Sequence, residues 1–294
     1  IKDSVSEFRE HALELGYSFF QSKVLLTATR LDVFNIIGET GISACDVATK
    51  LKSNVNATKM FLDAMVCLDL LKKDDRMYFN TENGREIFIK GSERYIGDIV
   101  NLQDVMWNAW SALGESVISG NPVRRPDMFQ EVKDETRNFI TAMHNTAMTV
   151  APILSNEIDL SRSKTLIDIG GGAGTYSVFF CKANSNLDAT ILDLSGTLEI
   201  TKELIFNSNV RNRIHLIEGD FNKEIKGQYD VAFLSNIIHG EGEIENMALM
   251  KRIYNALNSG GKIIIQDFIL DNDKTSPPFP ALFSLTMLLF TANG

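Results

Sequence analysis

A short glycine-rich segment constrains the fold of this chain more than any other feature. Residues 165–176 read TLIDIGGGAGTY, so three alternate glycines follow a short apolar run with an acid near its end. This order predicts a strand, a tight turn and then a helix. Glycine lacks the Cβ that would keep the backbone away from a ligand, and the free N–H groups at the start of the helix point into the same crevice. The segment therefore predicts a ligand-binding turn.

The spacing of the glycines distinguishes two classes of ligand. A dinucleotide fingerprint reads G-x-G-x-x-G, and its last position, counted from Gly170, is Thr175 here. The pattern present is Asp168-x-Gly170-x-Gly172-x-Gly174. An acid two residues before the first glycine suits a ligand that carries positive charge, such as the amino group and sulfonium of S-adenosylmethionine, better than it suits a pyrophosphate.

Two further predicted strands lead to acids. Residues 189–192 form a short β-run before Asp193, where the second strand of a doubly wound sheet offers a carboxylate to ribose hydroxyls. Residues 214–218 lead to Asp220 and Phe221, which offer a carboxylate for an adenine amino group and a ring for the base. Such turns and aspartates are also common loop chemistry. Acids at three successive strand ends favour the cofactor interpretation.

Composition and charge narrow the class of protein. A chain of 294 residues with 44% hydrophobic and 23% charged residues suits two globular domains with a core. The net charge of −9 argues against a nucleic-acid partner. Cys45, Cys67 and Cys181 are far apart and odd in number, which favours reduced thiols in the cytoplasm over disulfides or a zinc site. No apolar run reaches membrane-spanning length, and the nearest, residues 280–290, fits a buried helix.

Residues 1–95 are predicted to form a helical winged-helix domain. Apolar residues recur at three- and four-residue steps over residues 5–19, and helices are expected at residues 24–37, 43–51 and 56–71. Two short strands around a charged turn are expected at residues 70–79. Three helices and a hairpin make a winged helix.

A winged helix raises a second function class, a DNA-binding regulator. The helix that would enter a major groove, residues 56–71, has Lys59 as its only basic residue and carries Asp63 and Asp69. An acidic recognition helix would repel the phosphates that supply most of the affinity. The charges favour a domain for dimerisation and for covering an active site. The apolar stripe of residues 5–19 is predicted to pack across the two-fold axis of a homodimer.

Residues 96–158 keep a helical pattern, with aromatic and methionine side chains among polar ones. Such side chains at helical spacing are usually core. Because this segment leads into the strand before the glycine turn, we expect it to be a connector that lines the substrate pocket. Its large apolar side chains are Trp107, Trp110, Met128, Phe129, Phe139 and Met143.

Strands and helices alternate in residues 159–294. The expected strands are residues 165–169, 189–192, 214–218, 229–235 and 262–270, with helices at 175–184, 197–206 and 243–257 between them. Such alternation requires a parallel sheet with right-handed crossovers.

The catalytic candidate is His239, just past the predicted strand 229–235 and on the side where the cofactor should lie. Methyl transfer from a sulfonium to a hydroxyl needs alignment of the two and removal of the hydroxyl proton. A neutral imidazole is available for that at neutral pH. From position alone, a loop histidine that merely caps the strand explains the residue equally well.

The chain resembles the small-molecule O-methyltransferases, a family typified by plant caffeate and flavonoid, acetylserotonin, and bacterial carotenoid and bacteriochlorophyll-pathway O-methyltransferases. The resemblance runs from the winged-helix dimerisation domain through LIDIGGGAGT, ILDLSG, EGDF and LSNIIHG to IIIQDFIL. It implies an α/β fold with a doubly wound, Rossmann-like class I methyltransferase sheet. It also implies S-adenosyl-L-methionine as the cofactor, no metal, and a homodimer.

The resemblance also implies roles for single residues. His239 matches the general base, and Asp267 matches the acid that orients it. Phe139 and Met143 match positions that line the acceptor pocket, and Trp107 is the third predicted substrate residue. The predicted cofactor-binding residues are Asp168, Gly170, Gly172, Gly174, Asp193, Leu194, Asp220, Phe221 and Ser235.

Two features depart from the family pattern. Many members place Asp directly after the histidine, whereas this chain has Gly240 and then Glu241. The family continues beyond the position of Gly294 with another helix and a strand pair that completes the sheet. We expect a cytoplasmic O-methyltransferase that acts on a small aromatic or apolar acceptor. Two alternatives stay open: an N- or C-methyltransferase or non-catalytic member of the same fold, and a cofactor-sensing regulator.

Overall fold

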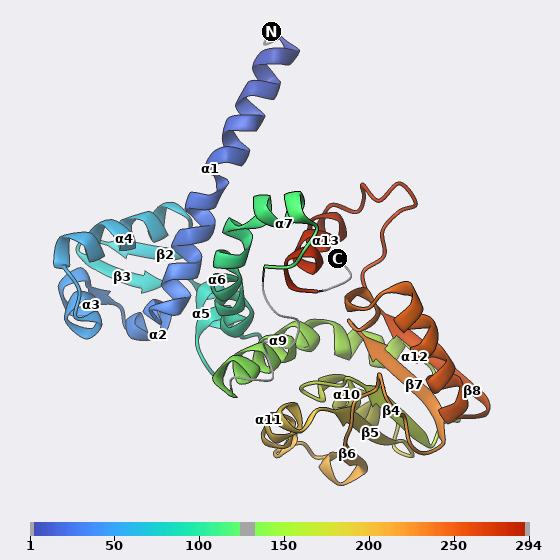
Figure 1. Ribbon diagram of the computed structural model, residues 1–294. Helices are drawn as coiled ribbons and strands as arrows, with labels where there is room; N and C mark the ends of the chain where they lie inside the picture. Colours follow the sequence, from blue (N-terminus) through green and yellow to red (C-terminus); the bar gives the residue numbers. More distant parts are fainter. Residues whose placement is uncertain (1–2, 124–132, 292–294) are drawn as a thin grey trace. The chain divides into compact units, whose positions relative to one another are not determined.

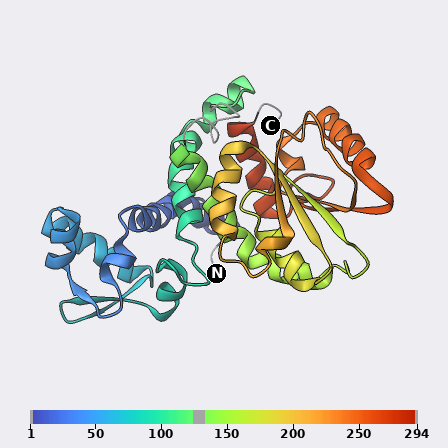
Figure 2. The same cartoon turned by 90° about the horizontal axis from the view of Figure 1, so that it is seen from below.

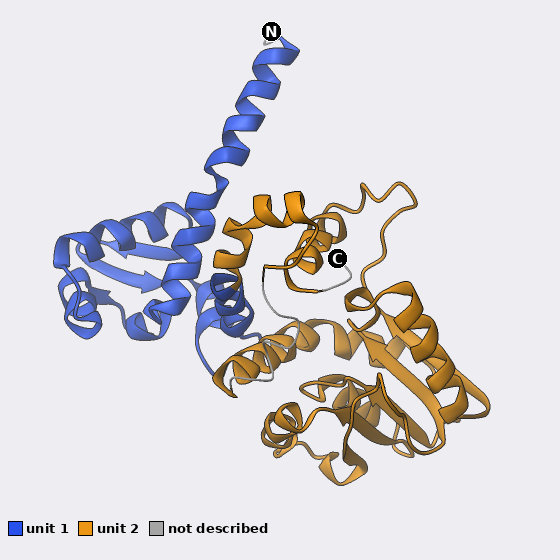
Figure 3. Ribbon diagram, in the orientation of Figure 1, with its two compact units in different colours: residues 1–105 blue, residues 106–294 orange. Residues whose placement is uncertain are grey.

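The computed structural model of this chain describes residues 3–123 and 133–291. The chain divides into two compact units, residues 1–105 and 106–294, which Figure 3 shows in different colours. The finer division expected from the sequence, with a connector at residues 96–158, stays a prediction.

The first unit combines helices with a small antiparallel sheet (Figure 1). Its helices are α1 (Ser4–Arg30), α2 (Val33–Ile37), α3 (Ala44–Leu51), α4 (Val55–Cys67) and α5 (Glu82–Phe88). Its strands are β1 (Ile42–Ser43), β2 (Leu71–Asp74) and β3 (Met77–Asn80), in the order β1-β3-β2. The hairpin of β2 and β3 is confirmed, whereas β1 is too short to leave an alternating pattern in the sequence.

The core of the first unit joins α2, α4, α5 and the hairpin. The rings of Phe34 and Phe88 stack with centroids 4.2 Å apart, and Leu62, Met65 and Tyr78 are buried beside them. These side chains come from elements that the sequence places far apart, so their burial holds the small unit together.

Helix α1 differs from the prediction. A helix at residues 5–19 and a second at residues 24–37 were expected, but α1 is continuous to Arg30. Residues 20–23 contain neither glycine nor proline, so nothing stops the helix there. The break comes at Asp32, whose φ of 57° lies in the left-handed region that aspartate tolerates. The predicted apolar stripe is exposed, with Phe8 72% and Leu15 62% accessible.

Helix α4 also ends earlier than the expected residue 71. It stops at Cys67 because Asp69 takes a left-handed φ of 56°, which turns the chain into β2. Its start agrees better with the sequence, since the side chain of Asn54 accepts a hydrogen bond from the N–H of Ala57 at 3.0 Å.

The second unit is built on a five-stranded parallel sheet. The strands are β4 (Thr165–Ile169), β5 (Asp188–Asp193), β6 (Ile214–Glu218), β7 (Tyr229–Ser235) and β8 (Leu257–Gln266), in the order β6-β5-β4-β7-β8. The helices between them are α10 (Thr175–Ala183), α11 (Ser195–Ile205) and α12 (Glu243–Ala256). Figure 2 shows helices on both faces of the sheet. The predicted α/β fold with a doubly wound sheet is confirmed.

The strand order determines where the ligand-binding crevice of the sheet lies. β4, the first strand of the sheet, lies between β5 and β7, so the connections leave it toward opposite sides. In such sheets a crevice opens at the carboxyl ends of the two strands where the order reverses. The glycine turn follows β4 directly and therefore lies at this crevice.

β8 begins earlier than predicted, directly after α12. Tyr229 pairs with Leu257 and Val231 with Lys262, so residues 258–261 bulge out between the two pairs. Gly260 takes a φ of 80° in this bulge. The strand ends at Gln266, one residue before Asp267.

The remaining α-helices in the described residues are α6 (Gly97–Ser111), α7 (Leu113–Ser119), α9 (Lys133–Glu157) and α13 (Pro278–Phe290). Met128 and Phe129 lie outside the described residues. α13 is the helix expected at residues 280–290, but Phe279 and Leu282 on it are exposed, so it is only partly buried. No helix in the described part of the chain is long and apolar enough to cross a membrane.

Candidate active site

The three alternate glycines have different surroundings. All take a left-handed φ, between 53° and 73°. A Cβ on Gly170 would lie 2.5 Å from Ile237 Cδ1, and one on Gly174 would lie 2.7 Å from Ile191 Cδ1, so these two glycines pack against protein. A Cβ on Gly172 would have no neighbour closer than 3.9 Å. Gly172 is therefore the position where the turn presents bare backbone to open space.

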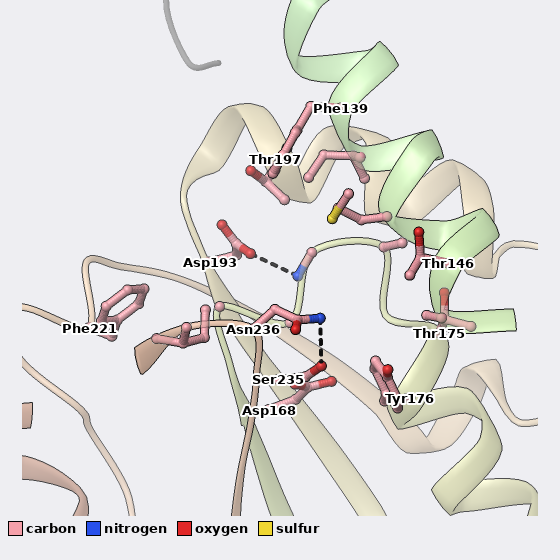
Figure 4. Close-up of a pocket in the computed structure, with 18 residues that line it drawn as sticks. Phe139, Thr146, Asp168, Thr175, Tyr176, Asp193, Thr197, Phe221, Ser235 and Asn236 are labelled. Carbon is pink, nitrogen blue, oxygen red and sulfur yellow. Dashed lines mark hydrogen bonds between the residues drawn. The ribbon is translucent and has the colours of Figure 1, made fainter. Parts of the chain in front are cut away.

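A pocket lies at this turn, at the carboxyl ends of β4 and β7 (Figure 4). All its residues belong to the second unit. Its lining consists of Phe139, Ile140, Met143, Thr146 and Ala147 of α9, then Asp168, Gly170, Gly171, Gly172, Ala173, Thr175 and Tyr176, and finally Asp193, Thr197, Phe221, Ser235, Asn236 and Ile237.

Asp168 forms the buried end of this pocket. Its side chain is almost inaccessible and accepts a hydrogen bond of 2.7 Å from the hydroxyl of Ser177. Burial raises the pKa of Asp168 to about 7, against the effect of the Ser177 hydrogen bond and with a further contribution from the negative charge of Asp193. A positively charged ligand would stabilise the ionised carboxylate here.

Asp193 ties the end of β5 to the glycine turn. Its Oδ2 accepts a hydrogen bond of 2.8 Å from the N–H of Gly172, and its Oδ1 accepts one of 2.7 Å from Leu194. Burial raises the pKa of Asp193, although the two backbone N–H groups counteract it. The carboxylate is thus fixed beside the exposed backbone of Gly172 (Figure 4).

Side chains at the ends of β7 and β8 form a hydrogen-bond network next to Asp168. The hydroxyls of Ser235 and Tyr176 both donate to Gln266 Oε1, at 2.5 and 3.2 Å. Asn236 Nδ2 donates to Ser235 Oγ at 3.4 Å. The network continues into the pocket through Asn236, which follows β7 in a left-handed conformation with a φ of 55°.

His239 lies in a short 3₁₀ turn, Ile238–Gly240, that follows β7. Its Nδ1–H donates to Asp267 Oδ1 at 2.5 Å. Burial alone would raise the pKa of Asp267, but hydrogen bonds from the His239 ring and from the N–H groups of Phe268 and His239 hold it below its ordinary value. An ionised Asp267 that accepts from Nδ1 leaves Nε2 of the ring as a free proton acceptor.

The turn that carries His239 is held from α12. Asn246 Nδ2 donates to the carbonyl oxygens of Ile238 and Glu241, at 2.9 and 3.1 Å. The Glu241 side chain accepts from Asn222 at 2.9 Å. Glu241 therefore joins the neighbouring loop, and among the described residues it is Asp267 whose side chain hydrogen-bonds to the imidazole.

Two phenylalanine rings lie beside the histidine, and a third packs against both of them. The His239 ring centroid lies 5.3 Å from Phe283 and 6.0 Å from Phe268. Phe279 completes the group at 5.3 Å from Phe268 and 5.9 Å from Phe283. We call Phe268, Phe279 and Phe283 the phenylalanine cluster. It gives the face around the imidazole an apolar, aromatic character.

The structure brings most of the predicted site residues together. Those that line the pocket are Asp168, Gly170, Gly172, Asp193, Phe221, Ser235, Phe139 and Met143. Gly174 lies behind the turn against Ile191, and Leu194 is partly exposed at the end of β5. His239 and Asp267 are paired with each other beyond Ile237 and do not line this pocket.

Two further predicted residues, Trp107 and Asp220, are also absent from the pocket lining. Trp107 is half-buried on α6. The Asp220 carboxylate accepts from the N–H of Asn222 at 2.9 Å and pairs with Lys223 at 3.3 Å. Their predicted contacts with substrate and adenine remain predictions.

The sequence reasoning missed other lining residues, notably Thr175, Thr197 and Asn236. Thr175 and Asn236 lie within the motifs LIDIGGGAGT and LSNIIHG, and Thr197 directly follows ILDLSG, so their place in or beside a motif was the available signal. The phenylalanine cluster had no such signal, since Phe279 and Phe283 lie in an apolar run that predicts only a helix.

The donor and acceptor set of the pocket fits S-adenosylmethionine. Asp168 and Asp193 offer carboxylates to the pocket, and Gly172 offers open backbone. These groups suit a ligand with positive charge and hydroxyls. No three His, Cys, Asp or Glu side chains in residues 3–123 and 133–291 gather so that they could hold a metal ion.

The chain matches two protein families. Residues 120–294 match the O-methyltransferase domain, and residues 13–88 match the O-methyltransferase dimerisation domain. The chain is 27% identical over 286 residues to a 3-hydroxy-5-methyl-1-naphthoate 3-O-methyltransferase of Streptomyces sahachiroi, which covers 95% of this chain and 82% of that relative.

Further similarities extend this result. The chain is 25% identical over 275 residues to the N,N-dimethyltransferase OxyT of Streptomyces rimosus, covering 90% of this chain and 79% of the relative. The crystal structure of human N-acetylserotonin methyltransferase in complex with SAM matches with a TM-score of 0.90 at 23% identity. It covers 100% of this chain and 89% of the human one. This likeness confirms the fold.

Proposed function

Because this chain belongs to the O-methyltransferase family, we propose that His239 removes the proton from a hydroxyl of a small aromatic or otherwise apolar acceptor, whose oxygen is methylated. The methyl donor is S-adenosyl-L-methionine, which supplies an electrophilic methyl group on its sulfonium when bound. The observation that carries the proposal is the hydrogen bond of 2.5 Å between His239 Nδ1 and Asp267 Oδ1.

Different residues at the carboxyl edge of the sheet bind different parts of the cofactor. Asp193 accepts hydrogen bonds from ribose hydroxyls, and Phe221 packs on the adenine ring. Asp168 provides negative charge for the amino-acid end. Gly172 lets the backbone approach the ligand closely, because a side chain there would occupy open space in the pocket.

His239 acts as the base through its Nε2 atom. The hydrogen bond to Asp267 keeps the proton on Nδ1, so the Nε2 lone pair faces away from Asp267 and accepts the hydroxyl proton. The resulting imidazolium is stabilised by the ionised, buried carboxylate of Asp267, whose pKa is below its ordinary value. A positioned base of this kind contributes about 10² to 10⁴ in rate.

The phenylalanine cluster supports an aromatic or apolar acceptor. Phe268 and Phe283 lie beside the imidazole and Phe279 packs against both, and Phe268 and Phe279 are exposed, so their faces are available to a flat ligand. Aromatic rings prefer offset-stacked or edge-to-face partners, which an aromatic acceptor provides. A hydroxyl on such a ring would then stand next to Nε2.

The test is His239→Gln, which keeps a polar side chain of similar size. We expect kcat to fall by about 10² or more, because the proton acceptor is lost. The affinity for S-adenosylhomocysteine, measured by calorimetry, should stay within about twofold. Asp267→Asn should cost less in kcat, since the base remains but is less well oriented. His215→Gln, on the exposed side of β6, is the control.

Undiminished turnover of the His239→Gln variant would refute the proposal that His239 is the general base. It would mean that the acceptor loses its proton without help, as an acidic phenol can, or that another atom is methylated. The similarity to the N,N-dimethyltransferase OxyT keeps nitrogen as the second candidate. Mass spectrometry of the methylated product separates the two outcomes.

We also propose that the protein works as a homodimer. The first unit contains the dimerisation domain, and α1 leaves Val5, Phe8, Leu15 and Phe19 exposed. A second copy of α1 would cover these side chains in an isologous contact. Light scattering at micromolar concentration should show a dimer, and a monomer would contradict the proposal.

A cytoplasmic location and independence from metals complete the proposal. The location rests on Cys45, Cys67 and Cys181, which are unpaired in the structure. Cell fractionation tests it. Metal independence predicts that a chelator leaves turnover unchanged, and a chelator-sensitive reaction would point to a metal-assisted mechanism.

A further inference from the structure

Two loops meet at the side of the pocket where we place the adenine. We call residues 219–224, which follow β6, the β6 loop, and residues 236–242, which follow β7, the β7 loop. Phe221 and Ile237, one from each loop, line the pocket and belong to the same apolar cluster (Figure 4). A Cβ on Gly170 would lie 3.4 Å from Phe221 Cε1 and 2.5 Å from Ile237 Cδ1, so both side chains lie against this glycine. A shift of Phe221 therefore changes the packing of the β7 loop.

A side-chain hydrogen bond also joins the two loops. Asn222 Nδ2 in the β6 loop donates to Glu241 Oε1 in the β7 loop at 2.9 Å. Gly240 has no side chain, so Glu241 carries the first side chain after His239. The N–H of Glu241 donates to the carbonyl oxygen of Ile238 at 3.4 Å, which closes the 3₁₀ turn around His239. The hydrogen bond between the loops therefore ends two residues from the imidazole.

Arg252 on α12 fixes the orientation of the Asn222 amide. Its Nε donates to the carbonyl oxygen of Phe221 at 2.8 Å, and its Nη2 donates to Asn222 Oδ1 at 3.4 Å. The amide thus accepts from a guanidinium and donates to the carboxylate of Glu241. A flipped amide would turn its NH₂ toward the guanidinium and its oxygen toward the carboxylate, which both charges oppose. The link between the loops therefore has one orientation.

The β7 loop has other anchors, so its fold does not depend on this link. Asn246 Nδ2 donates to two carbonyl oxygens of the loop, and Asp267 accepts from the ring and from the N–H of His239. Asn222 is exposed, and a hydrogen bond at such a position replaces bonds to water, so its net contribution to stability is small. What the link adds is a connection between the loop that lines the pocket with Phe221 and the loop that carries the imidazole.

We propose that Glu241 is a positioning residue that couples adenosine binding to the position of the His239 ring. This inference rests on the proposed roles of Phe221 and His239. When adenine packs on Phe221, it restrains the β6 loop, and the hydrogen bond from Asn222 to Glu241 extends this restraint to the β7 loop. Packed side chains and hydrogen bonds that form a continuous path carry such coupling. The imidazole then occupies a narrower range of positions with the cofactor bound than without it.

Nuclear magnetic resonance of the imidazole tests the coupling without turnover. The chain has four histidines, so the Cε1–H resonance of His239 is assigned by its loss in His239→Gln. In the wild type, saturation with S-adenosylhomocysteine should shift and sharpen this resonance. In Glu241→Ala the shift should be about half or less of the wild-type value, because the link is lost. The affinity for S-adenosylhomocysteine, measured by calorimetry, should stay within about threefold, because the groups that contact the cofactor are unchanged.

Further variants separate the hydrogen bond from the charge of Glu241. Glu241→Gln keeps an oxygen that accepts from Asn222, so it should restore the wild-type shift. Asn222→Ala removes the donor and should behave like Glu241→Ala. The double variant should lose no more than either single variant, because both changes remove the same hydrogen bond. Glu243→Ala, at an exposed acid in the first turn of α12, is the matched control and should leave the shift intact.

Three results would overturn the proposal. An equal shift of the His239 resonance in the wild type and in Glu241→Ala would mean that the cofactor affects the imidazole without this link. A failure of Glu241→Gln to restore the shift would assign the effect to the charge of Glu241. A loss of S-adenosylhomocysteine affinity of about tenfold or more in Glu241→Ala would mean that Glu241 supports the cofactor pocket itself.

This test is independent of the test of the general base. Full turnover in His239→Gln would refute the base, but the resonance of His239 in the wild type would still report whether the two loops are coupled. Conversely, loss of turnover in His239→Gln with equal shifts in the wild type and in Glu241→Ala would keep the base and refute the coupling.

Discussion

The two ends of the candidate site are built in different ways. At the cofactor end, the glycine turn, Asp193 and Asp168 lie at the carboxyl ends of the neighbouring strands β4 and β5 and are fixed by short hydrogen bonds to backbone and hydroxyl groups. At the acceptor end, His239 meets Asp267 from one loop and Phe283 from a distant helix. The first end is assembled by the sheet itself, whereas the second depends on packing between remote segments and leaves aromatic surface exposed.

This difference predicts whether a substitution changes the binding of the cofactor or the binding of the acceptor. A change at the cofactor end alters groups that the sheet holds rigidly, so its cost falls on cofactor affinity. A change at the acceptor end alters apolar contacts of partly exposed rings, so it should be smaller and should fall on the acceptor. The predictions below test this separation.

Asp193→Ala should give the largest effect on binding. The variant loses a carboxylate that we assign to the ribose and that also fixes the N–H of Gly172. Two lost hydrogen bonds to a charged group correspond to about 10² in affinity for S-adenosylhomocysteine. Calorimetry measures it. Asp188→Ala, at the exposed opposite end of the same strand, is the control, and unchanged binding in Asp193→Ala would break the comparison.

Gly172→Ala should weaken S-adenosylhomocysteine about tenfold or more, because the new methyl group would occupy space that the ligand needs. A non-glycine residue at a left-handed φ also costs roughly 1–2 kcal/mol of unfolding free energy. Gly260→Ala separates the two effects. Gly260 likewise has a left-handed φ, of 80°, and no atom lies within 4 Å of an added Cβ, but this glycine lies in the bulge of β8.

Both alanine variants should lose similar stability in denaturant unfolding, and only Gly172→Ala should lose affinity. Equal affinities for the two variants would show that the backbone of Gly172 does not touch the cofactor.

Phe283→Ala should raise the KM for the acceptor by about tenfold or less, the value expected for losing one aromatic contact. The affinity for S-adenosylhomocysteine should not change, because Phe283 lies beside His239 and not in the pocket lining. Leu282→Ala, an exposed neighbour on α13, is the control. A loss of cofactor affinity in Phe283→Ala would remove the distinction between the two ends.

The smallest predicted effect is the change in affinity for S-adenosylhomocysteine with pH. Burial raises the pKa of Asp168 to about 7, so the carboxyl group is mostly protonated at pH 6 and mostly ionised at pH 8. A cationic ligand prefers the ionised form, so the affinity for S-adenosylhomocysteine should fall by about three- to tenfold between pH 8 and pH 6. Asp168→Asn should remove this dependence.

The stability of the ligand-free protein should change in the opposite sense. The pKa of Asp168 is higher in the folded state than in the unfolded state, so the folded state binds the proton more tightly. The contribution of this group to the free energy of unfolding therefore rises as the pH falls from about 7 toward 4. Denaturant unfolding of the wild type and of Asp168→Asn at several pH values isolates it.

The sequence predicts the cofactor end well for a physical reason. β4, β6 and β7 begin and end at the predicted residues, since short apolar runs bounded by glycine and aspartate are local signals. Parallel strands then bring their carboxyl ends to one edge, so adjacent motifs become neighbours in space. Asn236 was not singled out, although it lies in the motif LSNIIHG, because its place in the pocket lining depends on a left-handed turn and on the hydrogen bond from its N–H to Gln266.

The acceptor end is less predictable for the complementary reason. His239 was found by its place after a strand and by family resemblance, but its contact with Phe283 depends on how α13 packs. The continuity of α1 was missed because the stretch from Phe20 to Lys23 is polar enough to resemble a break, although it contains no helix-breaking residue.

The exposed helix α1 has a consequence for the synthesis of the protein. Val5, Phe8 and Leu15 on α1 are exposed, and no described residue of the chain buries them. Because we propose that a second copy covers these side chains, scarce expression should favour aggregation or proteolysis of α1 over assembly.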